Sequence, residues 1–218
     1  MIDIKGIIFD LDGVIISTDE FHYIAWKKIA DQEGIPFDRI KNNQLRGISR
    51  MNSLDIILKN AKKIYSKEEK EKLCEEKNNI YKKELKSLSN NDLKEDVKNT
   101  LKYLKDCGYK LGIGSSSKNT QFILSQIGLD GFFDTVVTGW DIKKSKPDPE
   151  VFLLAATKLK IDPEKLAVVE DSLSGIEAAK KGGFLPIGIS YATTSSLCEI
   201  KINNLSDLKT ILKVNNYE

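Results

Sequence analysis

The sequence of 218 residues predicts an α/β protein: a doubly wound, mainly parallel sheet of the Rossmann-like type with an inserted helical cap. Two observations predict this class. Short apolar runs bounded by turn residues alternate with helical patterns over residues 109–190, as in parallel sheets covered by helices on both faces. Between the first apolar run and the second lies a tract of about 80 residues with helical periodicity and no strand pattern. A hydrophobic share of 40% is enough for a real core.

Five short apolar runs predict buried strands: GIIFDL (6–11), YKLGIGSS (109–116), TVVTG (135–139), LAVVED (166–171) and LPIGIS (185–190). Helical patterns at 118–128, 148–160 and 172–182 separate the last four. Pro149 follows the turn KPDP and is expected at the first helical position, while Gly182 and Gly183 are typical of a helix end. The alternation predicts a parallel sheet with helices on both faces.

The long tract after the first strand predicts helices at 19–33, 49–60 and 66–87, and a further helix at 94–107 leads into the second strand. An insert of this size between the first two strands indicates a cap over the carboxyl edge of the sheet. We therefore divide the chain into a core (residues 1–15 and 91–218) and a cap (residues 16–90).

The charge balance argues against a polyanionic partner. The 34 basic and 32 acidic residues are interleaved and give a net charge of +2, so we expect neither nucleic acid nor a membrane as a partner. The three cysteines are scattered, which predicts no disulfide framework or zinc site and fits a reducing compartment. The N-terminus lacks a signal-peptide pattern, and no apolar run approaches the ~20 residues of a membrane span. We expect a cytoplasmic protein that acts as a monomer.

Polar side chains gather at the carboxyl ends of the predicted strands, where open parallel sheets bind their ligands. Four carboxylates, a hydroxyl and a lysine belong to this set: Asp10, Asp12, Ser115, Lys146, Glu170 and Asp171. Several acids at one edge repel one another unless a cation holds them, and oxygen ligands suit Mg²⁺. The sequence thus predicts a magnesium site. Taken singly, Ser115 could be an ordinary turn residue and Lys146 an exposed loop lysine.

Four segments, FDLDGVIIST, GIGSSSKN, SKPDPEVF and VVEDSLSGIEAAKKGG, resemble the ordered motifs of the haloacid dehalogenase superfamily of phosphotransferases. The resemblance covers almost the whole chain. It implies that Asp10 attacks the phosphoryl group and carries it as an acyl phosphate. It also implies that Asp12 gives a proton to the leaving oxygen and later takes one from the acceptor.

The same resemblance assigns Mg²⁺ to the Asp10 carboxylate, the Asp12 backbone carbonyl and Asp171, with Glu170 as a ligand or its neighbour. Ser115 and Lys146 would neutralise the phosphoryl oxygens in the transition state. Backbone N–H groups, including that of Ser116, would add to this cradle.

Three cap segments, STDEFHYIAW, LRGISRMNSL and EKNNIYKK, are similar to the β-phosphoglucomutase family of that superfamily. The similarity assigns Arg50 to a remote phosphate that is not transferred, with help from Ser117 and Asn119 of the core. A planar guanidinium suits this task because it can donate two hydrogen bonds to one phosphate. Lys118, at the entrance of a predicted helix, is also well placed for an anion.

Thr18 and His22 lie at the junction of core and cap. The similarity implies that Thr18 belongs to the hinge that brings Asp12 into place as the cap closes. It implies that His22 relays or orients the proton transfer near the substrate. The alternative is that His22 is an ordinary first-turn helix histidine.

The same likeness extends to the loop before Arg50. Gly47 and Ser49 would let its backbone approach the sugar. Arg46 stands where the family pattern has lysine, and it would either alter the substrate geometry or simply keep the positive field. Lys77 matches a cap lysine of the family and would face the cleft, the alternative being a solvated helix face.

The favoured function is the interconversion of β-D-glucose 1-phosphate and β-D-glucose 6-phosphate, through an aspartyl-phosphate on Asp10 and a β-glucose 1,6-bisphosphate intermediate. The partners implied are a sugar phosphate and glucose 1,6-bisphosphate as the priming donor. An alternative is a Mg²⁺-dependent phosphatase that acts on sugar phosphates or other small phosphomonoesters. A catalytically silent binding module would also keep the fold, but the set of strand-end residues argues against it.

Overall fold

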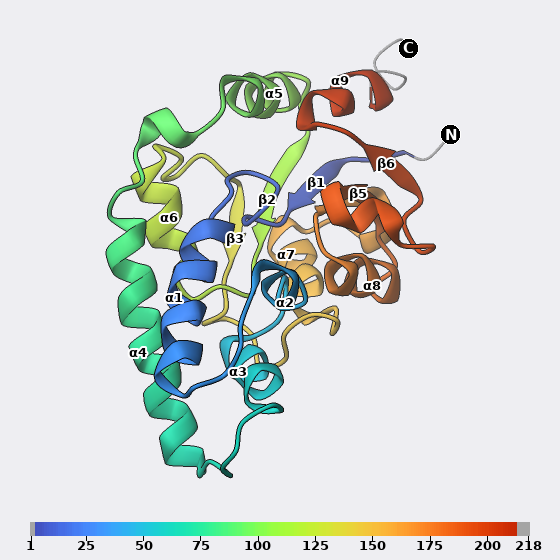
Figure 1. Cartoon of the computed structure of the whole chain (residues 1–218). Coiled ribbons are helices and arrows are strands. Elements are labelled where there is room, and N and C mark those ends of the chain that lie inside the picture. Colours follow the sequence, from blue (N-terminus) through green and yellow to red (C-terminus); the bar gives the residue numbers. More distant parts are fainter. Residues whose placement is uncertain (1–2, 213–218) are drawn as a thin grey trace.

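A computed structural model describes residues 3–212 and contains one six-stranded sheet (Figure 1). Its strands are β1 (Gly6–Phe9), β2 (Lys110–Gly114), β3 (Thr135–Val137), β4 (Leu166–Glu170), β5 (Leu185–Ile189) and β6 (Ile200–Ile202). Their order is β3-β2-β1-β4-β5-β6, and every neighbouring pair is parallel. The predicted doubly wound parallel sheet is confirmed. The chain leaves β1 toward one edge and later returns to its other side, so β1 lies at the switch point where such sheets bind ligands.

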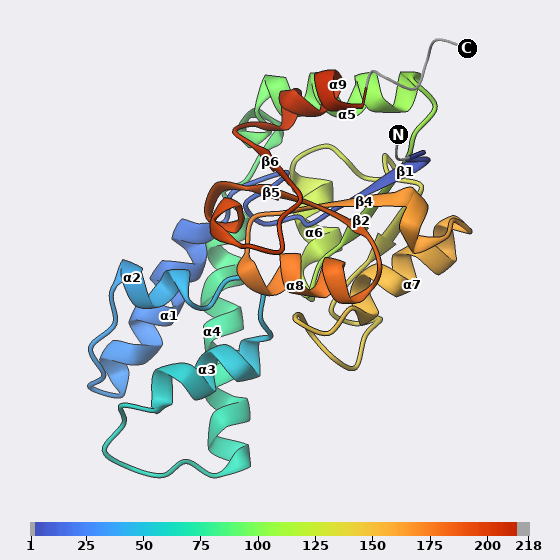
Figure 2. The ribbon, with the colours of Figure 1, turned by 90° about the vertical axis from the view of Figure 1, so that its right-hand side faces the viewer.

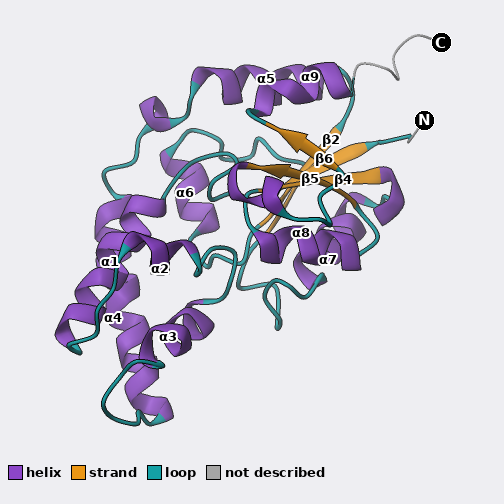
Figure 3. Cartoon of the chain, turned by 45° about the vertical axis from the view of Figure 1, so that its right-hand side comes forward, coloured by secondary structure: helices purple, strands orange, loops and turns teal. Residues whose placement is uncertain are grey.

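Helices cover both faces of this sheet. They are α5 (Glu95–Asp106), α6 (Thr120–Gln126), α7 (Glu150–Leu159), α8 (Leu173–Lys181) and α9 (Leu208–Ile211). Successive side chains of a strand point to opposite faces. Accordingly, Ile7 and Phe9 join the apolar cluster that contains α5 and α6, whereas Ile8 joins the cluster of α7 and α8. Figures 2 and 3 show α5 and α9 running together on one face and α7 and α8 on the other.

Three elements, a strand and two short helices of which one is α9, were not predicted from the sequence. Strand β6 has three residues, which is too short for a recognisable alternation. Helix α2 (Arg39–Asn43) has five residues and begins at Asp38, whose side chain accepts a hydrogen bond from the Lys41 N–H. The expected position of Pro149 was off by one, since it precedes the first residue of α7.

The tract between β1 and β2 forms the helices α1 (Asp19–Gln32), α2, α3 (Arg50–Leu58) and α4 (Lys67–Leu85) (Figure 1). Ser66 and Glu69 form a capping box that defines the start of α4. Trp26, Ile29 and Leu54 are buried in an apolar cluster of these helices, separate from the two clusters of the sheet. The boundaries of the core and the cap stay a prediction about domains, and the last six core residues lie outside the described residues.

Two further features bear on the site. Tyr81 and Leu85 of α4 pack into the apolar cluster of the sheet, so the end of α4 joins the cap helices to the core. None of the helices within residues 3–212 is long and apolar enough to cross a bilayer.

Candidate active site

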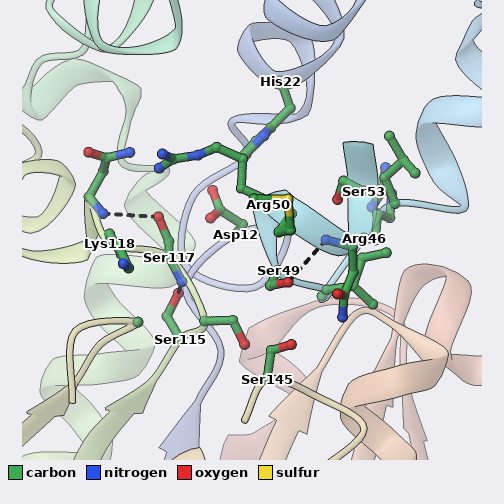
Figure 4. Close-up of a pocket in the computed structure, with 18 of the residues that line it drawn as sticks. Asp12, His22, Arg46, Ser49, Arg50, Ser53, Ser115, Ser117, Lys118 and Ser145 are labelled. Atoms are coloured by element: carbon green, nitrogen blue, oxygen red, sulfur yellow. Dashed lines mark hydrogen bonds between the residues drawn. The ribbon is translucent and has the colours of Figure 1, made fainter. Parts of the chain in front are cut away.

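A cavity of about 950 Å³ lies between the carboxyl ends of the strands and the helices α1, α3 and α4. The predicted site residues line this cavity except for Thr18, Lys146 and Glu170, which are buried, with at most 1% of their surface exposed. Figure 4 shows Asp12, Ser115 and Ser117 of the core facing His22, Arg46 and Arg50 of the cap around it. The structure therefore brings together residues that are separated by up to 161 positions in the sequence, from Asp10 to Asp171.

A buried lysine binds two carboxylates at the floor of the cavity. Asp10 follows β1, whose backbone is fixed between β2 and β4, and its own N–H donates to Val169 O at 3.0 Å. Lys146 Nζ donates to Asp10 Oδ1 and to Glu170 Oε1, both at 2.5 Å. The second Glu170 oxygen accepts hydrogen bonds from Ser172 N and Oγ, at 2.9 and 2.8 Å. Every charge of this group thus has a partner, as buried charges require.

The electrostatics of the floor follow from this arrangement. Burial raises the pKa of Asp10 well above its ordinary value, Lys146 opposes that rise, and Glu170 and Asp171 add to it by repulsion. Burial alone would lower the pKa of Lys146, but the attraction of Asp10 and Glu170 outweighs it and raises that pKa. The Lys146 ammonium therefore lies beside a carboxyl group whose ionised form it favours, against burial and the repulsion of two neighbouring acids.

Asp12 is held by Thr18, a residue that the resemblance assigns to the hinge. Thr18 Oγ1 donates to Asp12 Oδ1, and the same hydroxyl lies 2.9 Å from the Tyr81 hydroxyl of α4. Burial raises the pKa of Asp12 to about 6, against the lowering effect of the Thr18 hydrogen bond. Gly13, with a φ of 83°, is required next to it, because a Cβ there would lie 2.1 Å from Asp171 Oδ2.

Arg46 joins the cap to the carboxyl end of β4. Its Nη1 donates to Asp171 Oδ2 at 2.7 Å and its Nη2 donates to Asp19 Oδ2 at the start of α1. Burial and the neighbouring Glu170 raise the pKa of Asp171 to about 7, although Arg46 opposes the shift. Gly47 lets the loop approach this closely, since a Cβ there would lie 2.5 Å from Ser172 Oγ.

The carboxylates of the floor also bear on metal binding. Within the described residues no group of three or more His, Cys, Asp or Glu side chains is arranged to hold a metal ion. Asp10 and Glu170 form ion pairs with Lys146, and Asp171 forms one with Arg46. The donor chemistry nevertheless fits Mg²⁺: the set is made of oxygen atoms only. Repulsion from Glu170 and Asp171 also raises the pKa of Asp10, an effect that a divalent cation would reverse.

A second group of donors lies around the loop after β2. Ser117 N donates to Ser115 Oγ and Asn119 N donates to Ser117 Oγ, both at 3.2 Å, which fixes the loop as it enters α6 (Figure 4). Arg50 Nη2 donates to Asn78 Oδ1 at 2.7 Å, and Asn119 Nδ2 donates to the same oxygen at 3.0 Å. Ser116 Oγ is buried and has no hydrogen-bond partner among the described residues. This side of the cavity is thus rich in N–H and O–H groups, which an anion requires.

His22 and Lys77 form a buried pair in the cap. Lys77 Nζ lies 2.8 Å from His22 Nδ1 and 4.5 Å from the centre of the Tyr81 ring. The solvated helix face considered for Lys77 is wrong, since only 2% of the residue is exposed. Burial lowers the pKa of both groups well below their ordinary values. Repulsion from Lys77 adds to the shift of His22, and repulsion from Arg50 adds to the shift of Lys77. His22 is part of the cavity wall, and its role in proton transfer stays a prediction.

Sequence reasoning missed several residues with direct contacts in the site, among them Asp19, which binds Arg46, and Ser172, which binds Glu170. Asn78 and Tyr81 follow Lys77 on α4, and the helical spacing of Lys77 and Tyr81 was a signal that both face the cavity. Trp140 was also missed: its Nε1 donates to Lys118 O at 2.9 Å, and Lys118 Nζ lies 4.2 Å from its ring centre. No pattern in the sequence indicated that contact.

The sequence pattern of the haloacid dehalogenase-like hydrolases matches residues 7–189. The chain therefore belongs to the haloacid dehalogenase-like hydrolase family and is an enzyme of that family. The resemblance to β-phosphoglucomutases is confirmed as well. The β-phosphoglucomutase of Bacillus subtilis (strain 168) is 39% identical over 94% of this chain and 91% of that protein. The crystal structure of a β-phosphoglucomutase from Clostridium difficile superposes with a TM-score of 0.90 at 35% identity, covering 96% of each chain.

Phosphatases are also among the relatives. The phosphorylated carbohydrates phosphatase of Thermotoga maritima is 31% identical over 82% of each chain. The fructose-1-phosphate phosphatase of Escherichia coli (strain K12) is 29% identical over 82% of this chain and 92% of that protein. The comparisons thus define the family of the enzyme and leave two reactions, transfer and hydrolysis, within it.

Proposed function

We propose that the enzyme is a β-phosphoglucomutase, which interconverts β-D-glucose 1-phosphate and β-D-glucose 6-phosphate. The observation that carries the proposal is the second group of donors, Arg50 with Asn119 and Ser117, which lines the same cavity as Asp10. A phosphatase needs to bind only the phosphate that it removes. A mutase must also hold the far phosphate of a bisphosphate intermediate while the near one is transferred.

Asp10 is the proposed nucleophile. Its carboxylate attacks phosphorus, the bond from phosphorus to the leaving sugar oxygen breaks, and an acyl phosphate forms. The Lys146 ammonium at 2.5 Å opposes the rise in the pKa of Asp10 that burial causes, and it would neutralise a phosphoryl oxygen. Ser115, at the end of β2, would donate a hydrogen bond to the same group.

Asp12 is the proposed acid and base. Its pKa of about 6 lies close to neutral pH, so giving a proton to the leaving oxygen and taking one from the attacking hydroxyl both cost little. Thr18 orients the carboxyl from the end of the cap nearest the sheet. The contact between Thr18 and Tyr81 links that orientation to the position of α4.

Mg²⁺ is the proposed cofactor, with Asp10, the Asp12 carbonyl, Asp171 and Glu170 as the residues that would hold it. When bound, it would neutralise the crowded acids and the phosphoryl oxygens. Priming by glucose 1,6-bisphosphate would phosphorylate Asp10 before the first turnover. The three free cysteines within residues 3–212 fit a reducing compartment, and we place the enzyme in the cytoplasm as a monomer.

The phosphatase alternative is favoured by the two phosphatase relatives. A coupled assay separates the two reactions: β-glucose 1-phosphate is supplied with Mg²⁺ and a trace of glucose 1,6-bisphosphate, and glucose 6-phosphate and free phosphate are both followed. A mutase gives rapid glucose 6-phosphate and little free phosphate, with activity abolished in Asp10→Asn and weakened in Arg50→Ala. Free phosphate as the main product would refute the mutase and establish the phosphatase.

A further inference from the structure

One cap residue bonds to donors from both halves of the cavity. Asn78 lies on α4, is half-buried and lines the cavity. Its Oδ1 accepts hydrogen bonds from Arg50 Nη2 at 2.7 Å and from Asn119 Nδ2 at 3.0 Å. Arg50 begins α3 in the cap, whereas Asn119 precedes α6 in the core. A guanidinium has no acceptor, so the amide atom that faces Arg50 must be the oxygen, and the orientation of Asn78 is fixed chemically.

The shared oxygen fixes the two donors relative to each other. Both nitrogens lie within 3.0 Å of one atom, so they are less than about 6 Å apart, a span that one phosphate group can bridge with two of its oxygens. Arg50 uses a single N–H on Asn78 and keeps the rest of its fork for a ligand. Burial lowers the pKa of Arg50, which marks its guanidinium as partly desolvated and strengthens its hold on an anion.

We infer that Asn78 is a positioning residue that assembles the remote phosphate site from the cap and the core. The inference rests on the proposed function, in which Arg50 and Asn119 hold that phosphate. Opening of the cap would break the bond from Asn119 to Asn78, so the complete site exists only when the cap is closed. Binding of a substrate with two anionic ends would thereby favour closure, whereas a phosphate ester with one anionic end would not use this site.

The choice of asparagine matters for this role. An amide oxygen accepts from Arg50 without cancelling its charge, so the guanidinium stays free to attract a phosphate. A carboxylate in the same place would accept both hydrogen bonds more strongly, but it would neutralise Arg50 and repel the ligand. Asp and Asn have the same shape and differ in charge. Comparing them at position 78 therefore distinguishes a residue that positions donors for an anion from one that only stabilises the structure.

The test compares Asn78→Ala and Asn78→Asp with Asn79→Ala, which changes the next residue of α4 on its exposed side. Two substrates are used. When β-glucose 1-phosphate accepts the phosphoryl group from Asp10, its own phosphate is the remote one. Acetyl phosphate has no remote phosphate. We expect Asn78→Ala to raise KM for β-glucose 1-phosphate about 10-fold to 100-fold, because the donors lose their common acceptor. Hydrolysis of acetyl phosphate should stay within about twofold, since a remote site takes no part in it. Asn79→Ala should change neither.

The isosteric variant gives the sharper result. Asn78→Asp is expected to raise KM for β-glucose 1-phosphate more than Asn78→Ala does, in spite of its stronger hydrogen bonds. Rescue by Asp, or an equal loss with acetyl phosphate, would overturn the inference and make Asn78 a structural residue. An unchanged KM in Asn78→Ala together with a raised KM in Arg50→Ala would overturn it too. If Arg50→Ala and Asn119→Ala themselves left KM unchanged, the proposed function would fail instead.

Discussion

The Lys146 ammonium is the only cation within reach of two buried carboxylates at the floor of the cavity in the described structure, and methionine in its place would leave both without a cationic partner. The side chains of Lys146 and Glu170 are 0% exposed and that of Asp10 is 9% exposed, so water cannot replace the lost ion pairs. Removing one partner of a buried ion pair costs about 3–5 kcal/mol. We therefore expect Lys146→Met to lower the free energy of unfolding by about 3–5 kcal/mol at pH 8 in the absence of Mg²⁺.

The same variant should be less damaged in acid. Burial already raises the pKa of Asp10, and loss of Lys146, which opposes that shift, would raise it further. A carboxyl whose pKa is higher in the folded state than in the unfolded chain stabilises the fold at low pH. That stability is lost as the pH rises through the folded value, by up to about 1.4 kcal/mol per pH unit. The deficit of Lys146→Met should therefore be smaller at pH 5 than at pH 8.

Urea unfolding in EDTA at both pH values measures the difference. Lys144→Met is the matched control, because Lys144 lies in the same loop with a side chain that is 75% exposed, 3.7 Å from Asp148. Its unfolding curve should coincide with that of the parent protein. A deficit below about 1 kcal/mol for Lys146→Met at pH 8, or an equal deficit at both pH values, would refute the charge arrangement described above.

Three further results are expected. The affinity for Mg²⁺, measured by calorimetry, should fall about tenfold per pH unit below pH 7 and level off above it. The reason is that the pKa of Asp171 is raised to about 7, so protons compete with the metal below that pH. A pH-independent affinity would contradict this. Thr18→Val should move the acidic limb of the pH profile of kcat/KM to higher pH, because the hydrogen bond from Thr18 lowers the pKa of Asp12. An unmoved limb would mean that Asp12 does not control the rate. Arg46→Lys should raise the ratio of free phosphate to glucose 6-phosphate, because one ammonium cannot span Asp171 and Asp19 as the guanidinium does. Arg39→Lys, which changes an exposed pair with Glu20 inside the cap, is its control and should leave the ratio unchanged.

The residues of the floor could be predicted because the sheet itself determines where they lie. Each of Asp10, Ser115 and Glu170 ends or directly follows a short apolar run, and parallel strands deliver their carboxyl ends to one edge. Their separation in the sequence is large, but their register in the sheet is fixed by its backbone hydrogen bonds. Phe9, for example, pairs with Ile113 on one side and Val169 on the other, which sets the residues after them side by side.

The cap was harder to predict, because its residues meet the core through helix packing that no local pattern encodes. Lys77 reads as one more lysine on a charged helix, yet the packing of α1 on α4 buries it against His22 and Tyr81. Asn78 had no signal of its own, since its role depends on where Arg50 and Asn119 arrive in space. Such contacts between distant segments follow from the docking of the cap helices, which the periodicity of the sequence leaves open.

Two cap contacts with the core suggest why this site would exclude water when closed. Arg46 binds Asp171 beside the proposed site of transfer, and Asn78 binds Asn119 at the opposite side of the cavity. A cap held at one side only could tilt and admit water to the aspartyl-phosphate, whereas bonds at both sides restrict that motion. The guanidinium of Arg46 also reaches Asp19 at the start of α1, so the first contact fixes the helix next to Thr18 as well as the loop. Arginine at this position therefore makes two bonds at the side of the cavity where hydrolysis would occur.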